Sequence, residues 1–222
     1  MTRWAMVIDT ARCIGCGACT IACKTENATP GDIWYAPVIE EEVGEYPDAR
    51  MEYLPVLCNH CEDAPCIKAC PTKALSRRDD GIVLADDDAC IGSRACMNAC
   101  PYGALHLFEG RTGEWIGDGQ RSRATVPDAG GVQRYTVGTI QKCTFCVHRI
   151  DHGLEHDLVP GLDIAATPAC VVTCPAECRI FGDLEDAESN VSRYMRERGP
   201  ASVLRPDAET GAHVFYVDGS GR

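Results

Sequence analysis

The sequence lacks three features that would each place it in a common class of protein. No stretch approaches the ~20 consecutive apolar residues that a membrane-spanning helix needs, and no apolar run of the secretory-signal type follows Met1. Basic residues are scarce: 21 lysines and arginines face 33 aspartates and glutamates, for a net charge of −12. Because a basic face supplies most of the affinity for nucleic acid, that class of partner is excluded. We expect no membrane span and no signal peptide in this chain.

Familiar catalytic motifs are missing as well. There is no phosphate-binding P-loop, no G-x-G-x-x-G dinucleotide fingerprint and no nucleophile elbow. Aromatic residues make up only 6% of the 222 residues, so bound metal groups are expected to take the place of part of a hydrophobic core. The sequence therefore predicts no catalytic residue and no substrate site in this chain.

Cysteine, by contrast, is abundant, with 16 residues gathered in four groups. The groups are Cys13, Cys16, Cys19 and Cys23; Cys58, Cys61, Cys66 and Cys70; Cys90, Cys96 and Cys100; and Cys143, Cys146, Cys170, Cys174 and Cys178. The first reads C-x2-C-x2-C-x3-C, the run by which bacterial ferredoxins hold [4Fe-4S] clusters. Zinc is the main alternative, but zinc sites use paired cysteines, whereas here a third follows at short spacing. A secreted disulfide framework is the other alternative, and no secretory signal supports it. The pattern favours iron–sulfur clusters and electron transfer.

A short repeat organises the chain. Cys70-Pro71, Cys100-Pro101 and Cys174-Pro175 each open a copy, in which the proline suits a first helical turn. Strands are expected at 4–9, 81–85, 134–140 and 213–217, and a helix over 184–198. The predicted fold class is α+β, with tandem bacterial-ferredoxin-like cluster modules over residues 1–182. Long loop insertions are expected at 30–56, 109–133 and 151–168, and a C-terminal helix/strand tail that contacts a partner over 183–222.

Two polar features are interpreted as surface. The acidic run Glu40-Glu41-Glu42 is expected to be a solvated face. His148, His152 and His156 are spaced four apart and could share a helix face, but a metal site there needs a further ligand, and Gly153 weakens the helix. We expect His148 to pack or hydrogen-bond near a cluster and the other two to face solvent or a partner.

The arrangement of these motifs resembles a known family, the four-cluster ferredoxin-like iron–sulfur subunits of the dimethyl sulfoxide reductase superfamily of molybdopterin oxidoreductases. The stretches that carry the resemblance are 6–9 leading into the cysteine run 13–19, then Cys58-Asn59-His60-Cys61, Lys142-Cys143-Thr144-Phe145-Cys146 and Gly182-Asp183-Leu184. It covers nearly the whole chain. Within the family the chain looks most like the small subunits of respiratory arsenate, polysulfide, thiosulfate and tetrathionate reductases. It is similar, more loosely, to the small subunit of pyrogallol–phloroglucinol transhydroxylase.

The resemblance implies four ligand sets, in which groups one and four interlock and groups two and three interlock. The sets are Cys13, Cys16, Cys19 and Cys174 for cluster 1, nearest the catalytic subunit; Cys143, Cys146, Cys170 and Cys23 for cluster 2; Cys58, Cys61, Cys66 and Cys100 for cluster 3; and Cys90, Cys96 and Cys70 for cluster 4. Clusters 1 to 3 are expected to be [4Fe-4S].

One position departs from the family pattern, because Ser93 stands where cluster 4 usually has a cysteine. Cluster 4 is therefore expected to be [3Fe-4S], or a [4Fe-4S] cluster with Ser93 as an alkoxide ligand, or absent as in the transhydroxylase. Cys178 is left over. It takes the place that Ala74 and Ala104 hold in the other copies of the repeat, and it is interpreted as a small buried residue near a cluster.

On this resemblance, the chain relays single electrons between a separate, larger catalytic subunit and an external redox partner. The catalytic subunit would hold molybdenum or tungsten on a pterin, and the outer partner would be a membrane-anchor subunit or a soluble carrier. The alternatives are the small subunit of a transhydroxylase or aromatic dehydroxylase, a free-standing polyferredoxin, and a zinc-stabilised binding module. The expected location is the cytoplasm, or the periplasm by export together with a signal-bearing catalytic subunit.

Overall fold

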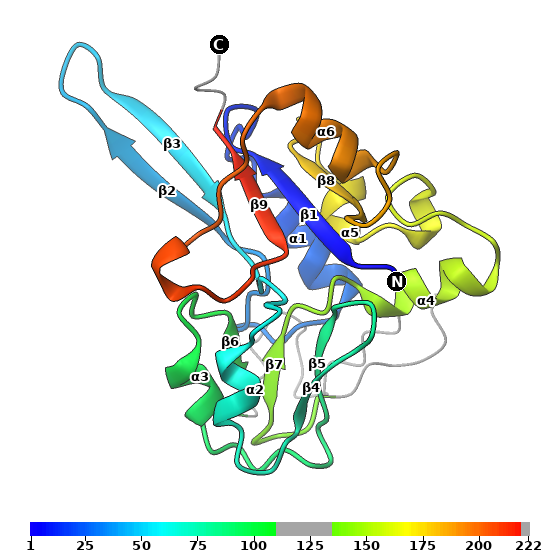
Figure 1. Ribbon diagram of the computed structural model, residues 1–222. Helices are drawn as coiled ribbons and strands as arrows, with labels where there is room; N and C mark the ends of the chain where they lie inside the picture. The colour runs from blue at the N-terminus through cyan, green and yellow to red at the C-terminus, as the bar shows by residue number, and fades with distance from the viewer. Residues whose placement is uncertain (110–134, 219–222) are drawn as a thin grey trace, which may run out of the picture.

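The computed structural model describes residues 1–109 and 135–218. The insertion expected at 109–133 lies outside the described residues apart from its first position. The described residues form two halves, one built from both ends of the chain and the other from its middle (Figure 1). This division follows the grouping of the cysteines, since groups one and four lie in the first half and groups two and three in the second.

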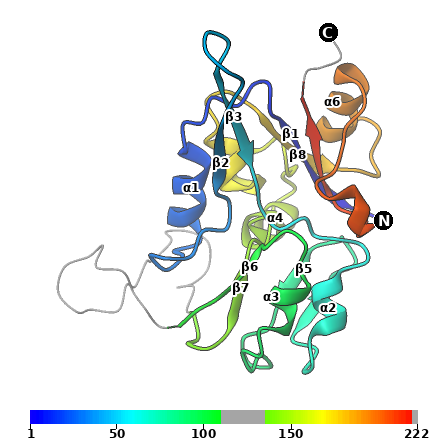
Figure 2. The same ribbon diagram turned by 90° about the vertical axis from the view of Figure 1, so that its left-hand side faces the viewer.

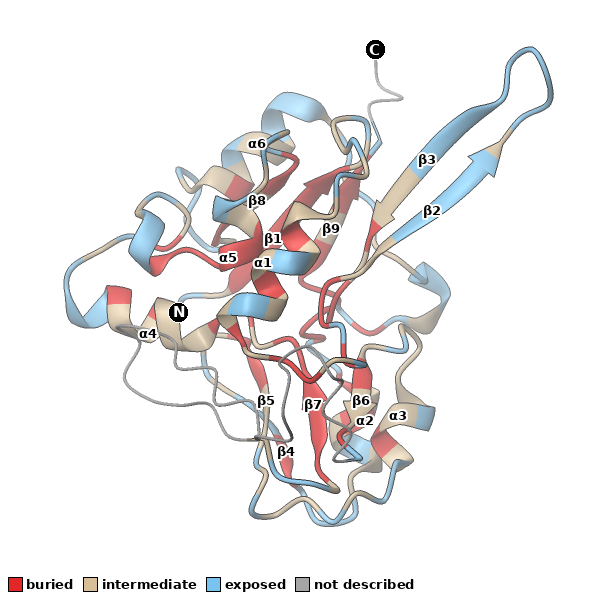
Figure 3. Ribbon diagram, turned by 180° about the vertical axis from the view of Figure 1, so that it is seen from behind, coloured by how far each residue is buried: buried red, intermediate tan, exposed pale blue. Residues whose placement is uncertain are grey.

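A three-stranded sheet forms the centre of the first half. Strand β1 (Trp4–Asp9) is its middle strand. It pairs antiparallel with β8 (Arg179–Asp183) and parallel with β9 (Val214–Val217), with Met6 opposite both Phe181 and Val214. All of β1 is buried, as Figure 3 shows. The expected first strand is confirmed, and the last starts one residue later than expected, at Val214. The segment expected as a tail thus contributes a buried strand to this sheet.

The two faces of this sheet are covered by different helices, as the alternation of side chains along β1 requires. Met6 and Ile8 share a buried cluster with Cys19 of α1 (Ala18–Glu26). Val7 points to the opposite face and packs with Val191 of α6 (Asn190–Arg198).

The second half contains two small two-stranded sheets and two short helices (Figure 2). In one sheet β4 (Leu75–Arg77) and β5 (Val83–Ala85) form a hairpin. In the other, β6 (Leu105–Leu107) pairs antiparallel with β7 (Ile140–Lys142), which lies much later in the chain. Helix α2 (Pro65–Ala69) packs against α3 (Ala95–Ala99), just as α1 packs against α5 (Ala169–Val172) in the first half. Each half therefore contains one pair of packed helices, and all four of these helices carry cysteines.

One predicted strand is misplaced and another is shorter than predicted. The strand expected at 134–140 is wrong: residues 136–139 form a turn in which Thr139 N–H donates to Thr136 O and Gly138 has φ +87°, and the strand begins only at Ile140. The strand expected at 81–85 is confined to 83–85. Gly81 belongs to the preceding turn, where Ile82 N–H donates to the Asp80 carboxylate at 3.2 Å.

The helix expected over 184–198 begins at 190 instead. Asp183 and Asp186 accept backbone N–H groups from Glu185 and Glu188 through their carboxylates, at 3.0 and 2.9 Å. Such side-chain bonds compete with helical hydrogen bonds and favour turns. The helix starts after them, where Ser189 Oγ accepts the N–H of Ser192.

The segment 30–56 is not a plain loop. It contains a long antiparallel hairpin, β2 (Val38–Val43) and β3 (Arg50–Pro55), which projects from the body (Figures 1 and 3). The acidic run Glu40-Glu41-Glu42 lies on β2 and is exposed, as expected for a solvated face. Glu40 pairs in register with Tyr53, and the Tyr53 ring lies against Gly15 in the first cysteine loop.

The segment 151–168 is also partly regular. Its first five residues complete α4 (Val147–Glu155), and Ile164–Ala166 forms a short 3-10 turn that packs against α4. A further 3-10 turn lies at Pro206–Ala208. Across the described ranges, none of the helices combines the length and the apolar character that a membrane crossing requires.

Candidate iron–sulfur centres

All sixteen cysteines lie among the described residues, and all are free thiols. The structure gives the disulfide-framework alternative no support. The thiols instead gather in groups whose members are drawn from distant parts of the chain.

One group surrounds Cys23 at the end of the first cysteine run. Burial, followed by the charges of Cys143, Cys170 and Cys146, raises the pKa of the Cys23 thiol. Asn27 joins two of these sulfurs, since its side-chain amide donates to Cys23 Sγ at 3.5 Å and to Cys146 Sγ at 3.8 Å. Group one and group four of the sequence therefore meet here.

A second group lines a single pocket in the other half. Cys58, Cys61, Cys66 and Cys100 all face it, together with apolar residues. Burial raises the pKa of the Cys66 thiol to about 12, and the charges of Cys58, Cys100 and Cys61 act in the same direction. Four thiols from groups two and three thus share one largely apolar site.

The third group is smaller and lies at the outer end of that half. Burial, with the charges of Cys70 and Cys90, raises the pKa of the Cys96 thiol. Ser93 is exposed, and its hydroxyl accepts the N–H of Ala95 at 3.5 Å. Three thiols and a nearby serine make up this group.

The last group includes the left-over cysteine. Cys174 Sγ and Cys178 Sγ are 3.4 Å apart, and the hydrogen bond to Cys174, followed by burial, raises the pKa of the Cys178 thiol; the charge of Cys13 adds to the shift. Cys178 is buried, as expected of a small residue in this position. Burial raises the pKa of the Cys170 thiol, the charge of Arg179 acts against that rise, and Cys19 is near enough to add to it. Cys16 is exposed.

The loop that carries Ser93 keeps the backbone of the loop that carries Cys16. The two sequences are Cys-Ile-Gly-Cys-Gly-Ala-Cys at 13–19 and Cys-Ile-Gly-Ser-Arg-Ala-Cys at 90–96. Gly15 and Gly92 have φ of +68° and +65°, and the next left-handed residues, Gly17 and Arg94, have φ of +69° and +60°. Arg94 adopts a conformation that disfavours any residue with a Cβ, so tertiary structure rather than local preference maintains the loop.

The three copies of the Cys-Pro repeat share one turn. The residue three positions after each cysteine is left-handed, with φ +57° at Lys73, +61° at Gly103 and +48° at Glu177. Its N–H donates to the carbonyl of the cysteine in every copy. In this turn backbone N–H groups donate to the cysteine sulfur. Burial acts to raise the pKa of the Cys70 thiol, but the N–H groups of Leu75, Thr72 and Ala74 and the Thr72 hydroxyl together hold that pKa below its usual value.

These surroundings suit iron–sulfur clusters, because four thiols line one apolar site and backbone N–H donors reach the sulfur of another thiol. A zinc ion draws its thiolates to about 2.3 Å from one centre, whereas a cluster spreads them over the corners of a larger group. Donor N–H groups at sulfur are also what tunes cluster potentials.

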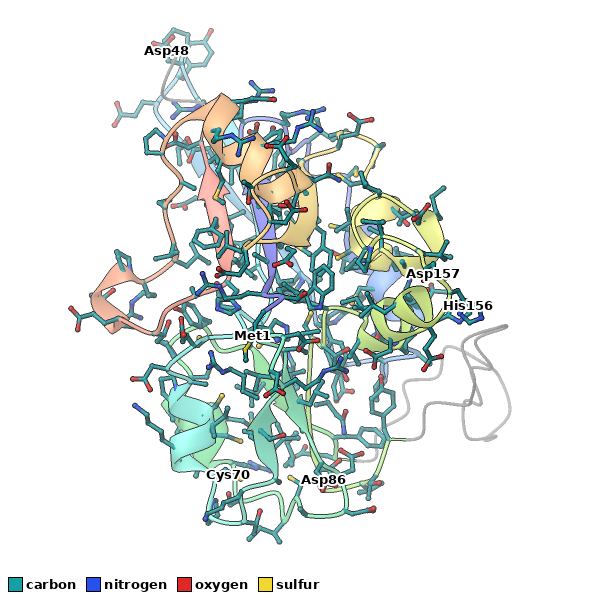
Figure 4. All side chains as sticks on the ribbon, turned by 45° about the vertical axis from the view of Figure 1, so that its right-hand side comes forward. Met1, Asp48, Cys70, Asp86, His156 and Asp157 are labelled. Atoms are coloured by element: carbon teal, nitrogen blue, oxygen red, sulfur yellow. The ribbon has the colours of Figure 1, made fainter. Side chains whose placement is uncertain are left out.

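The histidines on α4 do not form a metal site with one another. His148 Nε2 lies 2.8 Å from Glu26 Oε1, and Arg149 binds the other oxygen at 3.0 Å. His156 Nδ1 contacts the carbonyl of His152 at 2.7 Å and stands at the end of the helix (Figure 4). His148 therefore ties α4 to the end of α1, close to Cys23, while His156 is exposed.

Sequence reasoning missed two buried cations beside the thiols. Lys142 and Arg179 are only 2% and 3% exposed. Lys142 Nζ donates to Val83 O and to Cys143 O. Arg179 has two side-chain nitrogens with no protein acceptor. The available signal was a basic residue directly beside a cysteine motif in a strand-like run, as in Gln141-Lys142-Cys143 and Cys178-Arg179-Ile180.

The fold and these centres define a tandem ferredoxin-type iron–sulfur protein, and comparison with known proteins narrows the class. Two family models, both described as 4Fe-4S dicluster domains, match residues 12–74 and 49–116. The arsenate respiratory reductase iron–sulfur subunit of Shewanella sp. strain ANA-3 is 40% identical, over 97% of this chain and 96% of the relative. A tetrathionate reductase subunit of Salmonella typhimurium is 35% identical (97% and 72%), and a sulfite dehydrogenase subunit of Allochromatium vinosum is 34% identical (96% and 87%).

The chain therefore belongs to the family of iron–sulfur subunits of dimethyl sulfoxide reductase-type oxidoreductases. It is an electron-transferring, non-catalytic subunit of such an oxidoreductase. The resemblance found from the motifs alone is confirmed.

Proposed function

We propose that the chain holds four clusters in a row and relays single electrons along them. The proposed ligand sets are Cys13, Cys16, Cys19 and Cys174; Cys143, Cys146, Cys170 and Cys23; Cys58, Cys61, Cys66 and Cys100; and Cys90, Cys96 and Cys70, for clusters 1 to 4. When bound, each cluster accepts and returns one electron. The observation that carries the proposal is the gathering of these thiols from distant segments into separate neighbourhoods.

The order of the clusters is supported by thiols that are neighbours across sets. Burial raises the pKa of the Cys170 thiol of the second set, and Cys19 of the first set is near enough to add to that rise. Burial likewise raises the pKa of the Cys143 thiol of the second set, and Cys58 of the third set is near enough to add to it. Short helices link the sets in the same way: α1 carries Cys19 and Cys23, α2 carries Cys66 and ends at Cys70, and α3 carries Cys96 and ends at Cys100. Each helix thus presents one cysteine to one set and a second, about one turn later, to the adjacent set.

For cluster 4 we propose the [3Fe-4S] form. Only three thiols gather there, and a hydroxyl is a harder and less acidic ligand than a thiol. The exposed Ser93 hydroxyl is within reach of the Ala95 N–H and of water, so a competing hydrogen-bonded state is available to it. The loop keeps the conformation of the Cys16 loop, which supports a bound cluster in preference to none.

Two reciprocal substitutions, Ser93→Cys and Cys16→Ser, test the first ligand set and the nature of cluster 4 together. The chain is purified without air, and iron content and EPR spectra are recorded in the oxidised and reduced states. Wild type should hold about 15 iron atoms and show a sharp oxidised-state signal, and Ser93→Cys should hold about 16 and lose that signal. Cys16→Ser converts the first loop to the sequence pattern of the second, so it should lose about one iron and gain a second sharp signal.

The outcomes separate the alternatives. Full iron without the oxidised signal in wild type would mean that Ser93 or another group completes cluster 4. A colourless wild-type chain without iron would refute the electron relay and favour the zinc-stabilised module. An unchanged spectrum in Cys16→Ser would remove Cys16 from the first set.

We propose that the partner is a larger catalytic subunit carrying molybdenum or tungsten on a pterin, in keeping with the relatives named above. Ile14, in the loop that carries the exposed Cys16, and Ile21, on the following helix α1, are 61% and 55% exposed and support a covered surface at the cluster 1 end. Ile91, 69% exposed, lies next to the cluster 4 group at the opposite end. Copurification in size-exclusion chromatography tests this: a free polyferredoxin would elute alone, whereas an Ile14→Glu variant of a true subunit would lose its partner.

A further inference from the structure

Arg179 is a buried cation placed between two thiol groups. It is the first residue of β8, opposite Ile8 of β1, and is only 3% exposed. Met6, which its Nη1 contacts, belongs to the same buried cluster as Cys19 and Cys170. Burial works to lower the pKa of the guanidinium, and the thiols of Cys170 and Cys19 are near enough to outweigh it. In the proposed ligand sets, Cys19 belongs to cluster 1 and Cys170 to cluster 2.

The guanidinium is poorly satisfied by the protein itself. Its Nε and Nη2 atoms are buried without an acceptor, and Nη1 contacts Met6 Sδ at 3.8 Å. Burial raises the pKa of the Cys170 thiol, and the charge of Arg179 and a hydrogen bond from its guanidinium act against that rise. No ion pair involving Arg179 occurs in the described parts of the chain, which include every cysteine. Burying a cation without an anion is strongly unfavourable, so the fold is stable with Arg179 only if negative charge lies against it.

Lys142 shows that burial of a cation does not by itself call for such an anion. It is buried to the same degree, but its ammonium donates to two backbone carbonyls, Val83 O and Cys143 O. Arg179 differs from Lys142 because its guanidinium contacts the sulfur of Met6 and donates to no oxygen atom within the described residues. The planar guanidinium also has donors on more than one edge, which suits it to two acceptors at once.

We propose that Arg179 is a counter-ion shared by clusters 1 and 2, and that its charge holds the reduction potentials of both above the values they would otherwise have. The inference rests on the proposed function. Reduction adds a negative charge to a cluster, and a fixed positive charge at close range stabilises that reduced form. A cation between the two sites raises both potentials together, so it leaves the energy step for an electron passing between them nearly unchanged. The role of Arg179 is electrostatic: it changes the reduction potentials of the clusters and makes or breaks no covalent bond.

Four variants test the proposal. Arg179→Met removes the charge, Arg179→Gln removes it but keeps N–H donors, and Arg179→Lys keeps the charge without the planar fork. Arg196→Met is the matched control, because Arg196 is 55% exposed on α6 and pairs with Glu188. Each full-length chain is purified without air, with any subunit that copurifies, and EPR-monitored redox titrations give the one-electron potentials.

In Arg179→Met and Arg179→Gln, the reduction potentials of two of the four clusters should fall, and those of the other two should remain at the wild-type value. At a fixed applied potential, the ratio of reduced to oxidised cluster should drop on the order of tenfold, or about 59 mV for a one-electron couple. Arg179→Lys should shift less, and Arg196→Met should not shift at all. Wild-type potentials in an iron-replete Arg179→Met chain would overturn the proposal, and so would an equal shift of all four.

Loss of iron is also informative. If both neutral variants lose about half of their iron while Arg179→Lys keeps it, the charge is needed at two sites and the proposal stands. If Arg179→Lys loses iron as well, Arg179 serves packing and the proposal fails. Absence of clusters from the wild-type chain would instead refute the proposed function, so the two failures are distinguishable.

Discussion

Substituting Gly15 by alanine should damage the first cysteine loop far more than the same change at Gly17. Both glycines have left-handed backbones, with φ of +68° and +69°, so an alanine costs about 1–2 kcal/mol at either position. Only Gly15 has a neighbour in the way. A Cβ there would lie 2.2 Å from Tyr53 Cε1, whereas nothing lies within 4 Å of a Cβ at Gly17.

The size of the difference follows from the position of Tyr53. Its ring is rigid and is carried on β3 of the paired hairpin, so relief requires the hairpin or the loop to shift. Overpacking of this kind adds about 1–3 kcal/mol. We therefore expect Gly15→Ala to cost about 2–5 kcal/mol and Gly17→Ala about 1–2 kcal/mol.

The assay is thermal bleaching of the cluster absorbance under anaerobic conditions, together with retained iron. Gly15→Ala should bleach at a lower temperature than Gly17→Ala and lose iron selectively from one cluster. Tyr53→Ala combined with Gly15→Ala should recover the behaviour of Gly17→Ala, because the two sites are in direct contact and their effects are not additive. Equal bleaching of the two single variants, or no recovery in the double variant, would refute the contact between the hairpin and the loop.

Three other substitutions have definite expectations. Cys178→Ala introduces the residue found in the other repeat copies and removes a thiol 3.4 Å from Cys174 Sγ. The iron content should be unchanged, and the reduction potential of one cluster should fall in an EPR-monitored titration. Lys142→Met leaves two buried carbonyls without their donor, so unfolding by denaturant should become easier by about 2–4 kcal/mol; a change under about 1 kcal/mol would contradict the buried contact. Gly103→Ala meets no atom within 4 Å, so it should cost only the left-handed penalty of about 1–2 kcal/mol.

Most of what the sequence predicted correctly was local. The Cys-Pro repeat is one local feature, since its three copies share a turn with a left-handed residue at Lys73, Gly103 and Glu177. The helical turn expected at each proline is wrong, because each Cys-Pro opens a tight turn that leads into a strand. The failures occurred where polar side chains compete with the backbone. Asp183 and Asp186 replace a predicted first helical turn with side-chain hydrogen bonds, a competition that hydrophobic periodicity does not register.

Other errors came from a segment without apolar periodicity and from a pairing between distant segments. The hairpin at 38–55 is predicted as a loop, because an exposed hairpin has little apolar alternation to reveal it, and four consecutive residues of β2 are exposed. The parallel pairing of β9 with β1 joins residues more than 200 positions apart in the chain, at Met6 and Val214. Such contacts depend on which surfaces remain to be buried once the rest has folded.

By itself, the sequence determined the chemistry of this protein: the cysteine runs, the repeated turns and the departure at Ser93 specify iron–sulfur clusters and the family, because ligand spacing acts through a few neighbouring residues. Tertiary structure alone decided which thiols meet, that the Ser93 loop keeps the backbone of the Cys16 loop, and that Arg179 lies buried beside Cys19 and Cys170 with two donors unsatisfied. These depend on burial and on charges brought together from distant segments, and the electrostatic cost of a buried cation exists only once the chain has folded around it.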